Sequence, residues 1–136
     1  MGRRLILDAT TLVAYGRRAF DVAALDEDDL AVAAVTVAEF RTGIELADSA
    51  TRSADRARVL DAILSAVTVL DYTEDTAAQH ARLLAHVRRA GAPRGAHDLV
   101  VASHAAQTGR SVLSVDARAR FHGLPGVAAI MAPVTP

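Results

Sequence analysis

The stretch Arg3-Arg4-Leu5-Ile6-Leu7-Asp8-Ala9-Thr10 decides how the rest of the chain is interpreted. Its apolar run is continuous rather than alternating, which is typical of a strand buried on both faces of a parallel sheet. The predicted strand, Arg3 to Asp8, ends in a carboxylate and leads at once into a helix from about Thr10 to Tyr15. A carboxylate placed there lies beyond the carboxyl edge of the sheet, where α/β folds bind their ligands.

The remaining sequence repeats this alternation of strands and helices. Further strands are predicted at Leu30–Val35, Val67–Leu70, Ser111–Val115 and Val127–Met131, and helices from Thr36, at Ser53–Ala66, at Glu74–Ala90 and at Ala96–Gln107. The last of these helices is apolar around most of its circumference, so we expect it to be buried. The acidic stretch Asp26–Asp29 predicts a solvated connection. The order of elements predicts an α/β fold with a central parallel sheet flanked by helices on both faces.

Length and composition favour an ordinary globular protein. The 136 residues, 51% apolar and 23% charged, fit one domain over residues 1–136. No apolar run approaches the roughly 18 residues of a membrane span, and Leu5–Leu7 is too short for a signal peptide. We therefore expect a cytoplasmic protein without membrane contact. The absence of cysteine agrees, and it excludes disulfides, thiol nucleophiles and thiolate zinc sites.

All 15 basic residues are arginines, and the chain contains no lysine. This excludes Walker-type phosphate loops and Schiff-base enzymes, both of which need a lysine amine. A net charge of −1 gives no overall attraction to nucleic acid, so RNA binding would depend on a local patch. Solvated charge is the default interpretation of each arginine, but five fall in segments expected around the acidic crevice: Arg17, Arg18, Arg94, Arg118 and Arg120.

Four carboxylates stand where the hydrophobic pattern breaks. Asp8 and Asp116 follow predicted strands, and Glu39 and Asp98 lie near the starts of predicted helices. Each could be a helix cap or a turn residue. Their shared position at one edge of the sheet instead favours a site for a hard divalent ion, Mg²⁺ or Mn²⁺.

Glu39 has the strongest alternative explanation. Thr36-Val37-Ala38-Glu39 fits a capping box, in which the glutamate accepts a hydrogen bond from the backbone N–H of the threonine. Gly43 lies one turn beyond Glu39, where glycine costs about 1 kcal/mol relative to alanine. The missing Cβ admits either a neighbouring helix, the commoner case, or a substrate backbone.

The chain resembles a known family through a series of motifs in order: Leu5-Ile6-Leu7-Asp8-Ala9-Thr10, Ala38-Glu39-Phe40-Arg41-Thr42-Gly43, Asp98-Leu99-Val100-Val101-Ala102 and Leu113-Ser114-Val115-Asp116, with Phe121 beyond. Together they are similar to the motifs of PIN domains, and most of all to VapC-type toxin ribonucleases of toxin-antitoxin pairs. The resemblance implies a PIN-like fold and a metal-dependent endoribonuclease.

The resemblance also implies roles for particular residues. The four acids of the family correspond to Asp8, Glu39, Asp98 and Asp116, as ligands of Mg²⁺ or Mn²⁺ and as the catalytic groups. Its small hydroxyl residues correspond to Thr10 and Ser114, which would orient those ligands. The implied partners are an RNA substrate, a cognate VapB-type antitoxin and a second copy of the chain in a homodimer.

Two departures from the family pattern affect these expectations. Ala9 stands where many members have a hydroxyl residue, and Arg118 and Arg120 occupy a stretch where some have a further acid. A site with five acids is therefore not expected. Two other functions stay open from sequence: a catalytically silent PIN-like module that binds RNA or protein, and a metal phosphatase, for which no cap domain is visible.

Overall fold

The computed structural model describes residues 2–134 and shows an α/β fold with a five-stranded parallel sheet. The strands follow the order β3-β2-β1-β4-β5, and every neighbouring pair is parallel. The strands and α-helices are β1 (Arg4–Leu7), α1 (Ala9–Gly16), β2 (Asp29–Ala33), α2 (Ala34–Glu45), α3 (Ala50–Leu64), β3 (Thr68–Leu70), α4 (Glu74–Ala90), α5 (Ala96–Thr108), β4 (Ser111–Ser114) and β5 (Ala128–Met131). The predicted fold class is confirmed.

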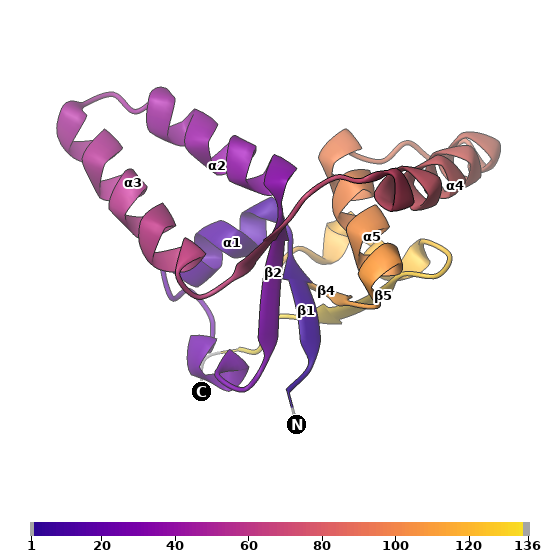
Figure 1. The fold of residues 1–136 in the computed structure, drawn as a ribbon, viewed down its shortest axis with the longest axis horizontal. Coiled ribbons are helices and arrows are strands. Elements are labelled where there is room, and N and C mark those ends of the chain that lie inside the picture. The colour runs from indigo at the N-terminus through magenta and orange to yellow at the C-terminus, as the bar shows by residue number, and fades with distance from the viewer. Residues whose placement is uncertain (1, 135–136) are drawn as a thin grey trace.

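Helices cover both faces of the sheet (Figure 1): α1, α2 and α3 lie on one side, and α4 and α5 on the other. The central strand β1 divides its side chains between two cores. Leu5 and Leu7 pack with Leu12 of α1 and Ile63 of α3, whereas Ile6 packs on the opposite face with residues of α4 and α5. All three β1 side chains are fully buried, as the continuous apolar run predicted.

The predicted helices occur with small differences at their ends. The α4 helix has the predicted bounds, and its C-cap, Gly91, takes the left-handed conformation with a φ of 64°. The α5 helix buries most of its circumference, as expected. The α2 helix differs, since it begins at Ala34 rather than at Thr36, with Ala33 as its N-cap.

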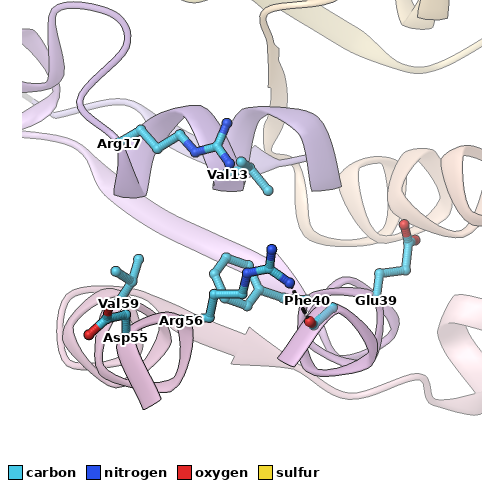
Figure 2. A pocket seen from close by; sticks show the side chains of 8 residues that line it. Val13, Arg17, Glu39, Phe40, Asp55, Arg56 and Val59 are labelled. Carbon is cyan, nitrogen blue, oxygen red and sulfur yellow. Dashed lines mark hydrogen bonds between the residues drawn. The ribbon is translucent and has the colours of Figure 1, made fainter. Parts of the chain in front are cut away.

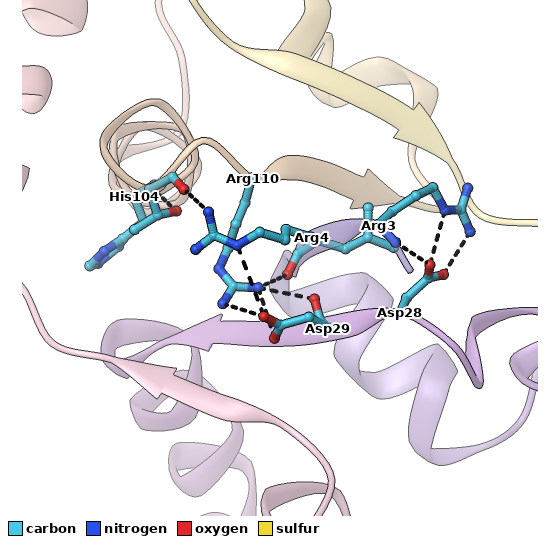
Figure 3. Close-up of polar contacts among 8 residues, drawn as sticks. Arg3, Arg4, Asp28, Asp29, His104 and Arg110 are labelled. Carbon is cyan, nitrogen blue, oxygen red and sulfur yellow. Dashed lines mark hydrogen bonds and ion pairs between the residues drawn. The ribbon is translucent and has the colours of Figure 1, made fainter. Parts of the chain in front are cut away.

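The amino ends of the strands carry a set of ion pairs (Figure 3). Arg3 donates to both carboxylate oxygens of Asp28, at 3.2 Å and 2.8 Å, and its guanidinium lowers the pKa of that carboxyl. The nearly buried Arg110 donates to the carbonyl oxygens of Leu5 (3.1 Å) and Asp29 (3.0 Å) and to the Asp29 carboxylate (3.2 Å). In the predicted solvated connection Asp26–Asp29, Asp26, Glu27 and Asp29 are exposed as expected, and only Asp28 is half-buried, beside Arg3.

The strand order creates a switch point at β1. The chain passes from β1 to β2 and β3 on one side, then returns by α4 and α5 to β4 on the other side. Open parallel sheets bind ligands in the crevice beyond the carboxyl ends of such strands. Within residues 2–134, no helix combines the length and apolar character needed to cross a membrane.

Candidate active site

Asp8 is the buried centre of the crevice. It follows β1 and is only 3% exposed, yet it carries a carboxylate that two neighbouring elements hold in place. Its Oδ1 accepts hydrogen bonds from the backbone N–H of Thr11 (3.0 Å) and from the Thr11 hydroxyl, and its Oδ2 accepts one from the Ser114 hydroxyl (2.9 Å). Asp8 is thus the N-cap of α1 and, through Ser114, a contact of β4.

The hydroxyl groups near Asp8 are not all the expected ones. Ser114 makes the predicted contact, and its Oγ also accepts from the N–H of Asp116 at 3.0 Å. On the helix side, however, the contact with Asp8 comes from Thr11, which is fully buried and also accepts from the N–H of Val115 at 3.0 Å. Thr10, which was expected to make this contact, is exposed and has no side-chain hydrogen bond within the described part of the chain.

Asp116 follows β4 and faces the crevice from the other side of Ser114. Its Oδ1 accepts from the backbone N–H of Arg118 at 2.9 Å, so it caps the short 3-10 helix η2 (Ala117–Ala119). The Arg118 guanidinium also approaches this oxygen, at 3.4 Å, but its side chain is 95% exposed. The capping role considered for Asp116 is therefore correct, but it uses only Oδ1. The other carboxylate oxygen, Oδ2, has no hydrogen-bond partner among residues 2–134.

Glu39 does not form the predicted capping box. Thr36 lies inside the first turn of α2, where its hydroxyl is buried and has no hydrogen-bond partner within residues 2–134. The carboxylate of Glu39 instead contacts Nδ1 of His97, at the start of α5. The capping-box explanation is wrong because α2 starts two residues earlier than its pattern suggested. Glu39 therefore lies beyond the first turn of the helix and cannot cap it.

The negative charges of the other three acids act on Asp98. Its pKa is raised, first by burial and then by the negative charges of Asp8, Glu39 and Asp116, while His97 lowers it. Asp98 does not cap α5, whose N-cap is Gly95 without a side-chain hydrogen bond. Asp98 therefore lies close enough to the other three carboxylates named from the sequence for their charges to disfavour its ionised form.

The chemistry of these donors fits a hard divalent cation, although the side chains are not arranged around one. Among residues 2–134, no three acidic or histidine side chains are grouped so that they could hold a metal ion as they stand. Three of the acids have other partners: Asp8 has hydroxyls, Asp116 has Arg118, and Glu39 has His97. The pKa of Asp98 is raised first by burial and then by the negative charges of the other three acids, and carboxylate oxygens are the ligands that Mg²⁺ and Mn²⁺ prefer.

His97 and Thr11 are the residues of this region that the sequence did not identify. His97 stands beside Asp98, but no spacing rule connects it to Glu39 on another helix. The other histidine of this helix, His104, has different surroundings from those of His97. His104 is buried with its Nδ1 unpaired within the described residues; its ring lies edge-on to Tyr72, and burial lowers its pKa although Asp71 raises it.

The five candidate arginines lie in different surroundings. Arg17 lines a groove together with Glu39, and Arg120 lines a pocket together with Asp116. Arg94 donates to the carbonyl oxygens of Ala119 and Arg120, each at 2.8 Å, so it braces that loop. Arg118 contacts Asp116, and Arg18 lies just past the end of α1 that is opposite to Asp8.

Comparison with known proteins identifies the family. The PIN domain model matches residues 5–124, which include all four acids. The chain belongs to the PIN-domain family. Its members generally use divalent metals, in agreement with the donors assembled here. Among curated proteins, none matches this PIN domain in sequence.

Solved structures of toxin-antitoxin complexes share the fold of this PIN domain. A chain of VapBC2 from Rickettsia felis, bound to a DNA fragment from its promoter, has a TM-score of 0.83 at 18% identity, over 94% of this chain and 98% of that one. DNA-bound VapBC from Salmonella typhimurium gives 0.81 at 23% identity, over 96% and 98%. VapBC-5 from Mycobacterium tuberculosis, a member of the VapBC family of toxin-antitoxin systems, gives 0.76 at 28% identity, over 96% and 98%.

Proposed function

We propose that this PIN domain is the toxin of a toxin-antitoxin pair and a Mg²⁺- or Mn²⁺-dependent endoribonuclease. The observation that carries the proposal is the placement of Asp8, Glu39 and Asp116 around Asp98, whose pKa is raised by burial and by these three charges. A cluster of carboxylates would repel a phosphodiester, so the site suits RNA only when a cation neutralises it. The likeness to VapBC structures supports the assignment as a toxin.

The proposed ligands are the four carboxylates, directly or through water. A bound Mg²⁺ or Mn²⁺ would supply an activated water and neutralise charge on the phosphate. The chain itself fixes the first acid: Thr11 and Ser114 hold both oxygens of Asp8, so its carboxylate has one orientation. Glu39 can change partners, because the contact that it makes now is to the half-exposed His97.

Asp98→Asn tests the proposal most directly. Asn keeps the shape of the side chain but removes the charge, so cleavage of total RNA in Mg²⁺ or Mn²⁺ should fall by about a hundredfold or more. Asp48→Asn is the matched control, since Asp48 is 71% exposed and pairs only with Arg52. Unchanged cleavage by Asp98→Asn would remove this residue from the site. Intact RNA that stays bound to the wild-type chain would favour the silent binding module, and hydrolysis of simple phosphomonoesters would favour a phosphatase.

Glu39→Gln separates a ligand from a structural residue. Gln can still accept a hydrogen bond from His97, so the melting temperature should hardly change, whereas metal-dependent cleavage should collapse. Calorimetry and an RNA cleavage assay on the same preparation measure both effects. Full activity in this variant would show that the Glu39 charge is dispensable.

The proposed partner is a VapB-type antitoxin whose tail docks between α1, α2 and α3. These helices border a groove of about 310 Å³ (Figure 2), with the apolar side chains Val13, Phe40 and Val59 and the cations Arg17 and Arg56. Val13 and Val59 are each 37% exposed, so the groove presents apolar surface to a partner. An apolar tail segment would cover them.

The groove also reaches the acids, because Glu39 is one of the residues that line it. A basic side chain of the tail could therefore contact the carboxylates and replace the charge of the metal. Titrating a tail peptide should then show competition with Mn²⁺ and weaker binding to Asp98→Asn. Equal affinity with and without metal would place inhibition elsewhere on the surface.

A further inference from the structure

A second pocket borders the acids on the other side, where the carboxyl ends of β4 and β5 meet the segment from Ala117 to His122. Its volume is about 240 Å³, smaller than the roughly 300–1,000 Å³ of pockets that hold drug-sized ligands. Ser114 and Asp116 belong to both the acid site and this pocket. A small group bound here would therefore lie next to any phosphate bound at the acids.

The walls of the pocket are apolar and partly uncovered. Phe121 forms a buried part of the wall, Ala129 and Ile130 of β5 are half-buried, and Met131 is 56% exposed. An exposed methionine at the mouth of a pocket offers a flexible, polarisable surface that makes favourable contacts with aromatic rings. The walls suit a flat, weakly polar group.

The pocket is also lined by one arginine, Arg120, whose guanidinium is available to a ligand. Arg120 lines the pocket, and its guanidinium forms no ion pair or hydrogen bond with the rest of residues 2–134. Its backbone has a φ of 50°, a conformation that costs a non-glycine residue energy. Arg94 stabilises that conformation by donating to the carbonyl oxygens of Ala119 and Arg120.

We propose that this pocket receives the base of a nucleotide that adjoins the cleaved phosphate, and so determines sequence preference. The inference rests on the proposed ribonuclease function. Single-stranded RNA is read by bases that leave the stack, contact apolar or aromatic side chains, and stack on or bind arginine. The pocket offers apolar walls and Arg120 together, directly beside Asp116. An apolar peptide side chain would contact the walls but would gain little binding energy from the nearby acids.

Two variants test the pocket without touching the acids. Met131→Ala shortens an exposed wall, and Arg120→Gln removes the charge but keeps hydrogen-bonding capacity. The matched controls are Leu46→Ala, an exposed apolar residue at the end of α2, and Arg89→Gln, an exposed arginine of α4. The cut ends of total RNA are mapped for each protein in Mn²⁺.

The wild type should prefer one base at a position next to the cut, and both pocket variants should reduce that preference by about tenfold, the usual size of one base contact. The controls should leave it unchanged. A cut map without base preference, or with a preference that neither variant alters, overturns the inference and leaves the ribonuclease function intact.

Binding separates failure of the pocket from failure of the ribonuclease. Asp98→Asn with labelled homopolymeric pentanucleotides should show a base preference by fluorescence anisotropy, and adding Met131→Ala should remove it. If the wild type cuts no RNA but this preference exists, the pocket stands and the ribonuclease function falls. If Met131→Ala weakens binding of the antitoxin tail and not of RNA, the pocket binds protein and the inference is wrong.

Discussion

Gly43→Ala should make the protein more stable and a poorer partner for the proposed antitoxin. Gly43 lies in the last turn of α2 with an ordinary helical backbone, and a Cβ built on it meets nothing within 4 Å. The helix packing offered from sequence as the commoner reason for this glycine is therefore wrong. Alanine should stabilise the helix by about 0.5–1 kcal/mol, which raises the melting temperature by roughly 2–4 °C.

The same methyl group enters the groove proposed for the antitoxin tail, because Gly43 is one of its lining residues. Tail binding should therefore weaken while the fold becomes more stable. The substitution should therefore change the stability of the fold and the affinity for the tail in opposite directions. Thermal unfolding measures the first, and isothermal titration with the tail peptide measures the second.

Gly16→Ala is the matched control, since it makes the same chemical change where space is short. Its Cβ would stand 2.8 Å from Cγ1 of Val59 and 3.1 Å from Cδ1 of Ile63, so these side chains or α3 itself must shift. We expect a loss of about 1–3 kcal/mol, as in other overpacked sites. A Gly43→Ala protein that melts below the wild type, or that binds the tail equally well, would refute the reasoning.

Three further predictions concern stability. Thr11→Val should cost on the order of 2 kcal/mol by removing a donor to Asp8 and an acceptor buried beside it, whereas Thr10→Val should cost little in the same urea titration; equal costs would contradict the assigned contact. Asp98→Asn should raise the melting temperature in metal-free buffer at pH 7, because the raised pKa of Asp98 means that its charged form destabilises the folded state. That gain should vanish below about pH 3, where the carboxyl is protonated in both states, and a gain independent of pH would show that it does not come from the charge of Asp98. His104 is held neutral by burial, so the wild type should lose stability as pH falls below about 6.5; His104→Leu should lose less between pH 7.5 and 5.5, and parallel losses would exclude His104 as the cause.

Local patterns were sufficient to predict the sheet and its helices. The short apolar run Leu5–Leu7, followed at once by Asp8, predicted a strand covered on both faces, and Gly91 with the following Pro93 marks the end of α4. The start of α2 was not predictable in this way. Thr36 is a good N-cap by type, but β2 ends early at Ala33 and the helix begins before the threonine is reached. The place where β2 ends in the folded sheet therefore determines where α2 begins.

The four acids could be named, while their immediate contacts could not. Thr10 and Thr11 are neighbours of the same type, and only the rotation of α1 relative to β4 decides which hydroxyl reaches Asp8. The pairing of His97 with Glu39 joins two helices across more than fifty positions. Contacts of this kind depend on packing angles, about which residue spacing carries no information.

The position of β1 in the sheet means that the acid site can assemble only late in synthesis. Its neighbour β2 follows soon in the chain, but its other neighbour, β4, is aligned with it through pairs such as Leu5 and Ser111. Chains emerge from the ribosome amino end first, and pairing over such a separation is slow. Asp8 is made first, yet Ser114 and Asp116 arrive only when most of the chain has been translated. A nascent or truncated chain without β4 therefore lacks the completed acid site, so the proposed ribonuclease activity would begin only late in translation.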